Sequence, residues 1–394
     1  MKKVYLDNMA TTRVLPEVLD AMLPYLGELY GNPSSLHSWG DDARDAMDEA
    51  RARVAALVNA APEEIVFTAT GTESNNLAVK GIAHAYQEKG RHIVISAIEH
   101  FSVMHSVRTL ERSGFTSTFV PVDKYAMVDP AEVAKAIRKD TILVSVMHAN
   151  GEVGTIQPVK EIAAVAKKAG VAFHTDAVAS AGNVPIDVKE MGVDALSMAA
   201  NQFYGPKGVA ALYVRRGVRF IPLFDGGIQE GGRRAGTDNV PGIVGMGKAA
   251  ELAKKDMTAR TSHVQPLRDR LIEGILKTPN AVLTGHPTVR LPHHASFCIE
   301  FIEGEAMLML MNMQGIAASS GSACTSRALK ASHVLLAQGV QHALAQGSLV
   351  FGLGVDNTGE DVDYVLQALP PIVARLREMS PLYDKYIKAR QGVS

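Results

Sequence analysis

The stretch that decides the fold runs from residue 142 to residue 177 and reads ILVSVMHANGEVGTIQPVKEIAAVAKKAGVAFHTDA. Two β-rich runs, ILVSVMHAN and VAFHTDA, flank a helical pattern, PVKEIAAVAKKAG, which opens after Pro158 and closes at Gly170 as helix-stop rules expect. A strand, a helix and a strand in this order are typical of a parallel sheet covered by helices. The stretch therefore predicts an α/β fold with a mainly parallel sheet.

The same alternation extends outward from about Ile65 to Val214, through the further β-rich runs EIVFTA, HIVISA, TSTFVPV, DALSMAA and VAALYVR. A long polar helix is expected from roughly Met257 to Leu276. Beyond it the pattern changes to a strand, HASFCIEFI, a helix, GEAMLMLMNMQ, and a terminal helix, DVDYVLQALPPIVARLREM. We therefore predict a large α/β domain over residues 15–257 and a small α+β domain over residues 1–14 and 258–394.

Composition narrows the class of protein. A chain of 394 residues with 47% hydrophobic content can bury a large core, and its net charge of -1 provides no basic field for nucleic acid. The opening MKKVYLDNMATT lacks the apolar run of a signal peptide, and no segment reaches about 18 uninterrupted apolar residues. Two cysteines make no disulfide framework, which fits a reducing compartment. We expect a cytoplasmic protein that binds neither nucleic acid nor membrane.

Residues just after the strands are the first candidates for a site, because ligands bind beyond the carboxyl ends of strands in open α/β sheets. Thr70-Gly71-Thr72-Glu73 follows EIVFTA, where a helix start can hold a phosphate, or where Thr72 simply caps the helix. His100 follows HIVISA, where it can stack on a cofactor ring, shuttle a proton or serve structure alone. Asp176 ends VAFHTD, where it can pair with a pyridinium nitrogen or cap the next turn.

The two cysteines differ in their surroundings. Cys324 lies in SSGSACTS, among small polar residues that provide no apolar packing, so we expect a reactive or ligand thiol. Cys298 alternates with apolar residues in a strand and is expected to be buried and inert. Residues 242–249 have the spacing of a phosphate-binding P-loop, but Ala249 replaces the metal-binding hydroxyl and no strand precedes them, so coincidence is the better explanation.

Nine stretches, in this order and over nearly the whole chain, resemble the cysteine desulfurases of iron–sulfur cluster assembly, members of the class V aminotransferase family with the type I fold of pyridoxal-phosphate (PLP) enzymes. They are YLDNMATT, GNPSSLHSWG, GTESNNLAVKG, IEH, DTILVSVMHANGEVGTIQPV, YGPKGVAALYVRR, RRAGTDN, IEGEAML and SSGSACTS. In that family a lysine holds PLP covalently, and a cysteine on a mobile loop takes sulfur from substrate cysteine, leaving a persulfide and alanine.

The resemblance assigns roles to residues of this chain. Cys324 matches the sulfur-accepting cysteine, His100 the histidine that stacks on the PLP ring, and Asp176 the partner of the ring nitrogen. Asn150 matches the residue beside the phenolic oxygen of PLP. Gly71 and Thr72 match the phosphate site, which Thr237 reaches from the second subunit of a homodimer.

The chain departs from the family where PLP and substrate are held. The family reads Ser-Gly-His-Lys before Tyr-Gly-Pro-Lys-Gly, whereas this chain has Ala-Ala-Asn-Gln at residues 199–202, so Gln202 replaces the Schiff-base lysine. Lys207 is no substitute, because the family has a lysine there as well. Ala179 replaces a glutamine that bonds the ring oxygen, and Val350 replaces an arginine that clamps the substrate carboxylate.

Three interpretations follow from this pattern. The first is a desulfurase-like homodimer that lacks ordinary PLP desulfuration and uses Cys324 as a persulfide carrier or as a ligand of an iron–sulfur cluster shared with a scaffold protein or sulfur acceptor. The second is an enzyme that works on cysteine or another amino acid with PLP bound without a covalent bond. The third is a structural or regulatory homodimer that uses no thiol.

Overall fold

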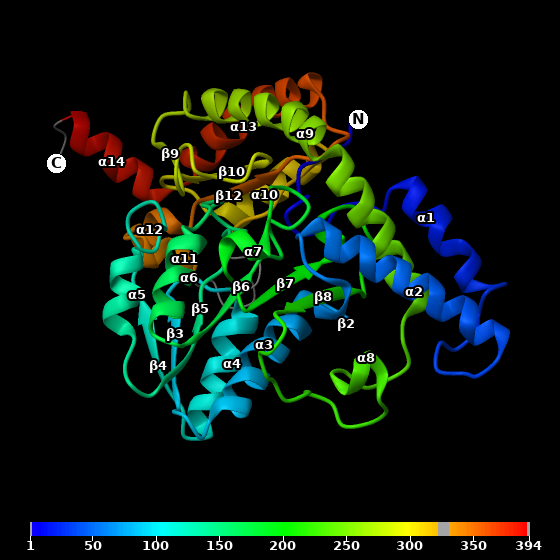
Figure 1. Cartoon of the computed structure of the whole chain (residues 1–394). Helices are drawn as coiled ribbons and strands as arrows, with labels where there is room; N and C mark the ends of the chain where they lie inside the picture. Colours follow the sequence, from blue (N-terminus) through cyan, green and yellow to red (C-terminus); the bar gives the residue numbers. More distant parts are fainter. Residues whose placement is uncertain (1, 322–330, 392–394) are drawn as a thin grey trace.

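The computed structural model describes residues 2–321 and 331–391. A seven-stranded sheet forms its centre, in the order β2-β8-β7-β6-β5-β3-β4 (Figure 1). Strands β4, β3, β5, β6 and β7 run parallel to one another, whereas β8 runs antiparallel between β2 and β7. The strands are β2 (Ile65–Thr68), β3 (His92–Ser96), β4 (Thr116–Val120), β5 (Thr141–Ser145), β6 (Ala172–Asp176), β7 (Ala195–Ala199) and β8 (Ala210–Val214). The predicted α/β fold with a mainly parallel sheet is confirmed.

Helices cover both faces of this sheet because alternate residues of each strand point to opposite faces. In β3, Val94 packs into a cluster with α2, α6 and α9, whereas Ile93 and Ile95 pack with α3 and α4. The helices around the sheet are α1 (Pro16–Met22), α2 (Ser38–Leu57), α3 (Gly71–Tyr86), α4 (Phe101–Arg112), α5 (Pro130–Ala136), α6 (Val159–Lys168), α7 (Val188–Met191) and α8 (Gln229–Gly232), with 3-10 turns η1 (Leu23–Leu26), η2 (Pro62–Glu64) and η3 (Ala200–Gln202).

Most elements of a second group pack around their own apolar cluster, whereas residues 334, 335 and 345 belong to a smaller cluster with Ile98, Met147 and Cys298. The second group holds an antiparallel sheet in the order β12-β10-β9 and a parallel pair of β1 with β11. Its elements are β1 (Val4–Tyr5), β9 (Ala281–Leu283), β10 (His294–Ile299), α10 (Gly304–Met313), β11 (Ile316–Ala317), α11 (His333–Ala337), α12 (His342–Ala345), β12 (Ser348–Gly352), α13 (Gly359–Glu378) and α14 (Pro381–Gln391). The division into two domains stays a prediction.

The long helix differs from expectation, since α9 spans Val240–Ile275 and the predicted boundary at residue 257 falls inside it. Residues 242–249, which have the spacing of a P-loop, form part of α9, which agrees with their dismissal as a phosphate loop. The predicted terminal helix is α13, but α14 follows it, because Ser380 and Pro381 start a new helix after α13 ends. No helix in the described ranges combines the length and apolar character needed to cross a membrane.

Candidate functional site

A cavity of about 540 Å³ lies beyond the carboxyl ends of β3, β5, β6 and β7, where the fold brings distant segments together. Its wall contains six of the predicted site residues, namely Gly71, Thr72, His100, Asn150, Asp176 and Gln202. Thr237 is exposed outside this wall, so its predicted reach into a partner subunit stays a prediction. Cys324 lies outside the described residues, although Ser319, Gly321 and Ser332 beside that segment line the cavity.

Asp176 ends β6 and is fixed by two donors. Asn75 Nδ2 donates to its Oδ2 at 2.6 Å, and the backbone N–H of Val178 donates to its Oδ1 at 2.9 Å. Burial raises the pKa of Asp176, and the nearby His100 lowers it. The carboxyl group is therefore rigid and lines the cavity, as expected for the partner of a ring nitrogen, and it also organises the turn after β6.

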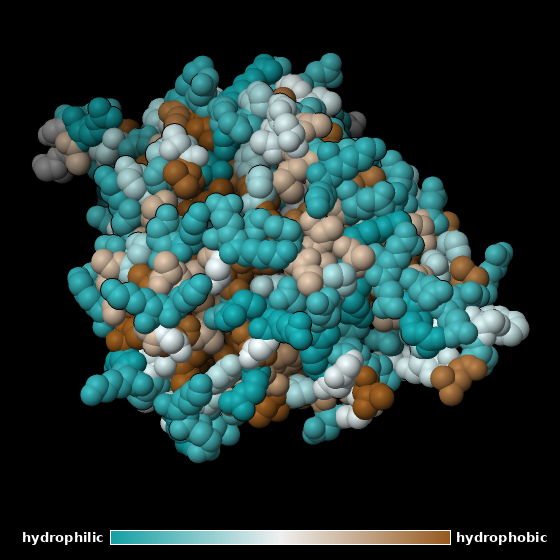
Figure 2. All heavy atoms as spheres, in the orientation of Figure 1, coloured by the Kyte–Doolittle hydropathy of each residue, from teal (hydrophilic) through white to brown (hydrophobic). Residues whose placement is uncertain are grey.

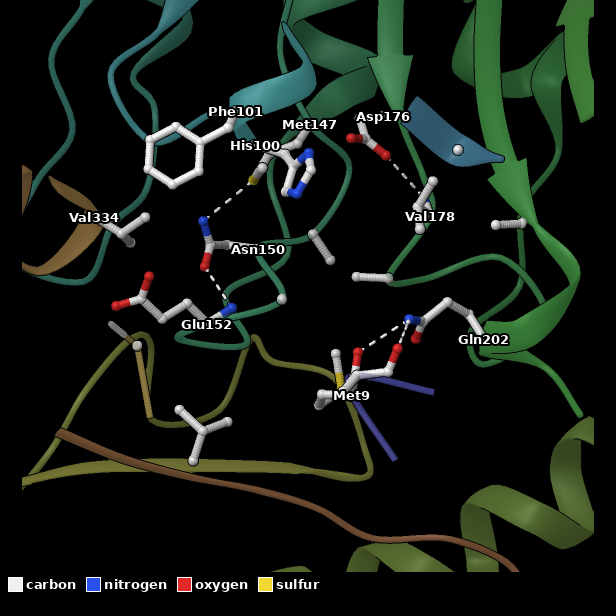
Figure 3. A pocket seen from close by; sticks show the side chains of 18 of the residues that line it. Met9, His100, Phe101, Met147, Asn150, Glu152, Asp176, Val178, Gln202 and Val334 are labelled. Carbon is white, nitrogen blue, oxygen red and sulfur yellow. Dashed lines mark hydrogen bonds between the residues drawn. The ribbon is translucent and has the colours of Figure 1, made fainter. Parts of the chain in front are cut away.

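His100 precedes α4 and caps it. Its Nδ1 accepts a hydrogen bond from the backbone N–H of Ser102 at 3.1 Å, so in the neutral ring Nε2 carries the hydrogen. The same ring lines the cavity (Figure 3). The structural and cofactor-stacking interpretations of His100 are thus compatible, because the cap uses one ring nitrogen and leaves the ring face available.

The start of α3 supplies the candidate phosphate site. The cap is Thr70, whose side chain accepts from Glu73 N at 3.1 Å, so the alternative that Thr72 caps the helix was wrong by two residues. The first N–H groups of a helix have no partner within it and carry partial positive charge. A Cβ at Gly71 would lie 2.6 Å from Val178 Cγ2, which explains why glycine occupies this close approach.

Asn150 lines the cavity, but both ends of its amide are engaged in the turn after β5. Its Nδ2 donates to Ile98 O at 3.0 Å and contacts Met147 Sδ at 3.3 Å, and its Oδ1 accepts from Glu152 N and Val153 N. Asn150 holds the turn in shape. Its match to the residue beside the phenolic oxygen of PLP stays a prediction. To contact that oxygen, Asn150 Nδ2 must give up its contact with Met147 Sδ.

Gln202 belongs to the turn η3 after β7, and its amide binds the N-terminal segment. Nε2 donates to Met9 O at 3.0 Å and to Ala10 O at 3.4 Å (Figure 3). Two carbonyl acceptors fix which end of the amide is nitrogen, because an amide oxygen there would face two further acceptors. The same segment is also held by Thr12, whose N–H and hydroxyl both donate to Asn201 O. The Gln202 side chain therefore holds the N-terminal segment in place, and we call this contact the amide clamp.

The other departures also meet at the cavity, since Ala179, Ala199 and Val350 all line it. Among the cavity residues that the structure describes, none is lysine or arginine. Residue-by-residue inspection of the sequence missed Asn75 and Glu152 as site residues. Both stand in family-like stretches, GTESNNLAVKG and HANGEVG, and the signal that would have found them was a polar residue near the start of the helix after β2 for Asn75 and in the turn after β5 for Glu152.

The sequence profile of the class-V aminotransferases matches residues 4–365. The chain belongs to the class-V aminotransferase family. This family member is 54% identical, over 98% of its length and 95% of the relative, to "Cysteine desulfurase IscS" of Methanosarcina thermophila, and 48% identical, over 97% and 100%, to "Cysteine desulfurase IscS 1" of Archaeoglobus fulgidus. Its fold matches a solved "NifS-like protein" with a TM-score of 0.90 and 38% identity, over 95% of this chain and 100% of that one.

The family is PLP-dependent, and the residues of this member fit PLP in part. Asp176 can pair with the ring nitrogen, and the His100 ring can cover the ring face. The start of α3 can bind the phosphate. The fourth contact would be the covalent bond to a lysine. Gln202 offers no amine for this bond, and its Nε2 already donates to two carbonyl groups. The donor set therefore suits PLP held by non-covalent contacts.

Proposed function

We propose that this chain is a sulfur-mobilising, desulfurase-like protein that is defective in ordinary PLP desulfuration and uses Cys324 as a persulfide carrier or cluster ligand. The observation that carries the proposal is the amide clamp at Gln202, because a residue bound to Met9 O and Ala10 O has been recruited for structure where the family has its reactive amine. The identity to cysteine desulfurases over nearly the whole chain supports a role in sulfur mobilisation.

In this proposal PLP occupies the cavity non-covalently if it binds at all. Asp176 would hold the ring nitrogen protonated, the first N–H groups of α3 would bind the phosphate, and His100 would cover the ring. When bound, PLP would withdraw electrons from the bonds of an attached amino acid. No lysine amine for proton transfer stands among the described cavity residues, and Val350 cannot pair with a carboxylate.

Cys324 would receive a persulfide sulfur, or ligate iron together with cysteines of a scaffold protein, because the chain has only one other cysteine. That second thiol, Cys298, is fully buried, and burial raises its pKa to about 12, so it is inert as expected.

We also propose that the chain forms a homodimer. Large apolar side chains are exposed along residues 19–39, among them Leu26 at 62% and Leu36 at 97% exposure. Figure 2 shows a largely hydrophilic face on which apolar side chains protrude at the edge near α1 and α2. A run of exposed apolar residues favours burial against another protein, and a second copy would also bring its Thr237 toward this cavity. Sedimentation of the purified chain tests the dimer.

The experiment for Cys324 supplies the protein with persulfide from an active desulfurase and measures sulfur on each cysteine by mass spectrometry. We expect one persulfide, at Cys324, and loss of sulfur transfer to a scaffold in Cys324→Ser. The neighbouring Ser326→Ala serves as the matched control and should transfer sulfur normally. A Cys324→Ser protein that supports cluster assembly as well as the control contradicts the proposal.

A second candidate function is PLP-dependent chemistry on cysteine or another amino acid with non-covalent PLP, and the intact Asp176–Asn75 pair favours it. Purified protein with a PLP absorption band that releases alanine from cysteine supports this alternative. Colourless protein without alanine release supports the carrier.

A further inference from the structure

Glu152 and Phe101 line the side of the cavity that lies away from Asp176 and Gln202. Figure 3 shows Phe101, Val334 and Glu152 on one side and Asp176, Val178 and Gln202 on the other. Two consecutive residues connect the pair, because Ser332 hydrogen-bonds to the Glu152 carboxyl group and the His333 ring lies 4.9 Å from the Phe101 ring. The carboxyl group and the aromatic ring therefore border the same space.

No lysine or arginine of the described residues is paired with the Glu152 carboxyl group. Its Oε1 is buried and has no hydrogen-bond partner in the part of the chain that the structure describes. No lysine or arginine stands in the described wall. Burial raises the pKa of Glu152 to about 8, so the group is largely protonated at neutral pH.

The neighbouring groups do not supply the missing charge. Among the described residues, the Cys298 thiol faces the Glu152 carboxyl group, whereas the His294 ring contacts the backbone of Glu152. Burial raises the pKa of Cys298 to about 12 and lowers that of His294 well below its usual range, so both are neutral near pH 7. Glycine at position 321 leaves space for the Glu152 carboxyl group, because a Cβ there would lie 2.0 Å from Glu152 Oε1.

We propose that this part of the cavity binds the cationic head of an organic ammonium ion, with Glu152 as the counter-ion, the Phe101 ring as a cation–π surface and Val334 as an apolar wall. Cations over aromatic faces gain most when both are desolvated, as in a cavity. The described wall of the cavity contains no lysine or arginine that could pair with a carboxylate ligand. The inference goes beyond the proposed function and does not depend on Cys324.

Three probes of similar size, each with a head that bears three methyl groups but with a different net charge, test the inference by calorimetry on the full chain. They are choline, 3,3-dimethylbutan-1-ol and 3,3-dimethylbutanoate, none of which has an amine that reacts with an aldehyde. We expect choline to bind roughly tenfold or more tightly than the alcohol, and the carboxylate to bind more weakly than the alcohol. Equal affinities, tighter binding of the carboxylate or no binding of choline overturns the inference.

Variants identify the groups responsible. Glu152→Gln should abolish the preference for choline, Phe101→Leu should reduce it, and Glu161→Gln, which changes an exposed acid on α6, should leave it unchanged. If Glu152→Gln does not fold, Phe101→Leu still decides, because unchanged choline affinity there contradicts the cation–π surface. Cys324→Ser should bind choline normally, so failure of the carrier proposal and failure of this inference are distinguishable.

A proton readout separates ligand binding from a purely structural role of Glu152. Choline should release a proton at pH 7 as Glu152 ionises, which appears as a dependence of the binding heat on the ionisation enthalpy of the buffer. At pH 9 and above, and in Glu152→Gln, this release should vanish. Choline binding without proton release in the unaltered protein at pH 7 contradicts the role of Glu152.

Discussion

Replacing Gln202 by lysine tests how the clamp affects chemistry. The new ammonium group can reach the carbonyl oxygens of Met9 and Ala10 that now bind the amide. A hydrogen bond from a charged group contributes about 1.5–3 kcal/mol, and the amine must lose this contact and its proton before it can react with PLP. We therefore expect the covalent bond to PLP to form about 10- to 100-fold less favourably than with an unrestrained lysine.

The assay is borohydride reduction with PLP followed by peptide mass spectrometry, together with alanine release from cysteine. The unaltered protein should carry no reduced PLP at the cavity, Gln202→Lys should carry some at position 202, and its desulfuration should stay poor because Ala179 and Val350 are unchanged. The triple variant Gln202→Lys, Ala179→Gln, Val350→Arg should be more active. Robust desulfuration by Gln202→Lys alone, or PLP on Lys207 in the unaltered protein, would refute the reasoning.

Three other changes have expected outcomes. Asp176→Asn should weaken PLP binding about 10- to 100-fold in a fluorescence titration, because the charged partner of the ring nitrogen is lost, and unchanged affinity counts against the assigned contact. Glu230→Gln should lower the free energy of unfolding in urea by about 3 kcal/mol, since Glu230 is buried and bound twice by Arg51, at 2.6 and 2.8 Å, whereas the exposed Glu49→Gln should change it little. Glu99 is fully buried, and burial raises its pKa to about 8, so its protonated form stabilises the fold below about pH 4.5 and this contribution is lost as pH rises through about 8. Urea unfolding should show a smaller fall in stability between pH 5 and pH 8.5 in Glu99→Gln, and an unchanged slope contradicts the assignment.

The sheet was predictable because local patterns determine it. The strand, helix and strand of residues 142–177 appear as β5, α6 and β6, with α6 ending at Lys168 just before Gly170 at a positive φ of 70°. The start of α9 was not predictable in the same way, since its first part is rich in glycine, which disfavours helix in isolation. Tertiary packing overrides that preference, because Gly247 lies against α2, where a Cβ would meet Ala50 at 2.6 Å.

Some residues of the candidate site were also predictable from local sequence patterns, and others were not. Strand ends located Asp176 and His100, because their positions follow from the parallel sheet alone. The partner of Gln202 could not be found from the sequence, because its amide binds backbone carbonyl groups almost two hundred residues away, and carbonyl groups carry no residue-specific signal. Glu152 escaped notice for a similar reason, since its unpaired oxygen is a property of the packed cavity.

The N-terminal segment has a consequence for the order of events on the ribosome. Val4 pairs with Ile316, Asp7 bridges to Gly352, and Met9 then meets Gln202. Val4 and Asp7 leave the exit tunnel about 300 residues before their partners in β11 and β12, so they wait for these partners for on the order of tens of seconds at ordinary elongation rates. Until β12 is made, the part of the cavity wall that contains Ser319 and Val350 is incomplete in the nascent chain, so a small ligand meets the whole cavity only after that point.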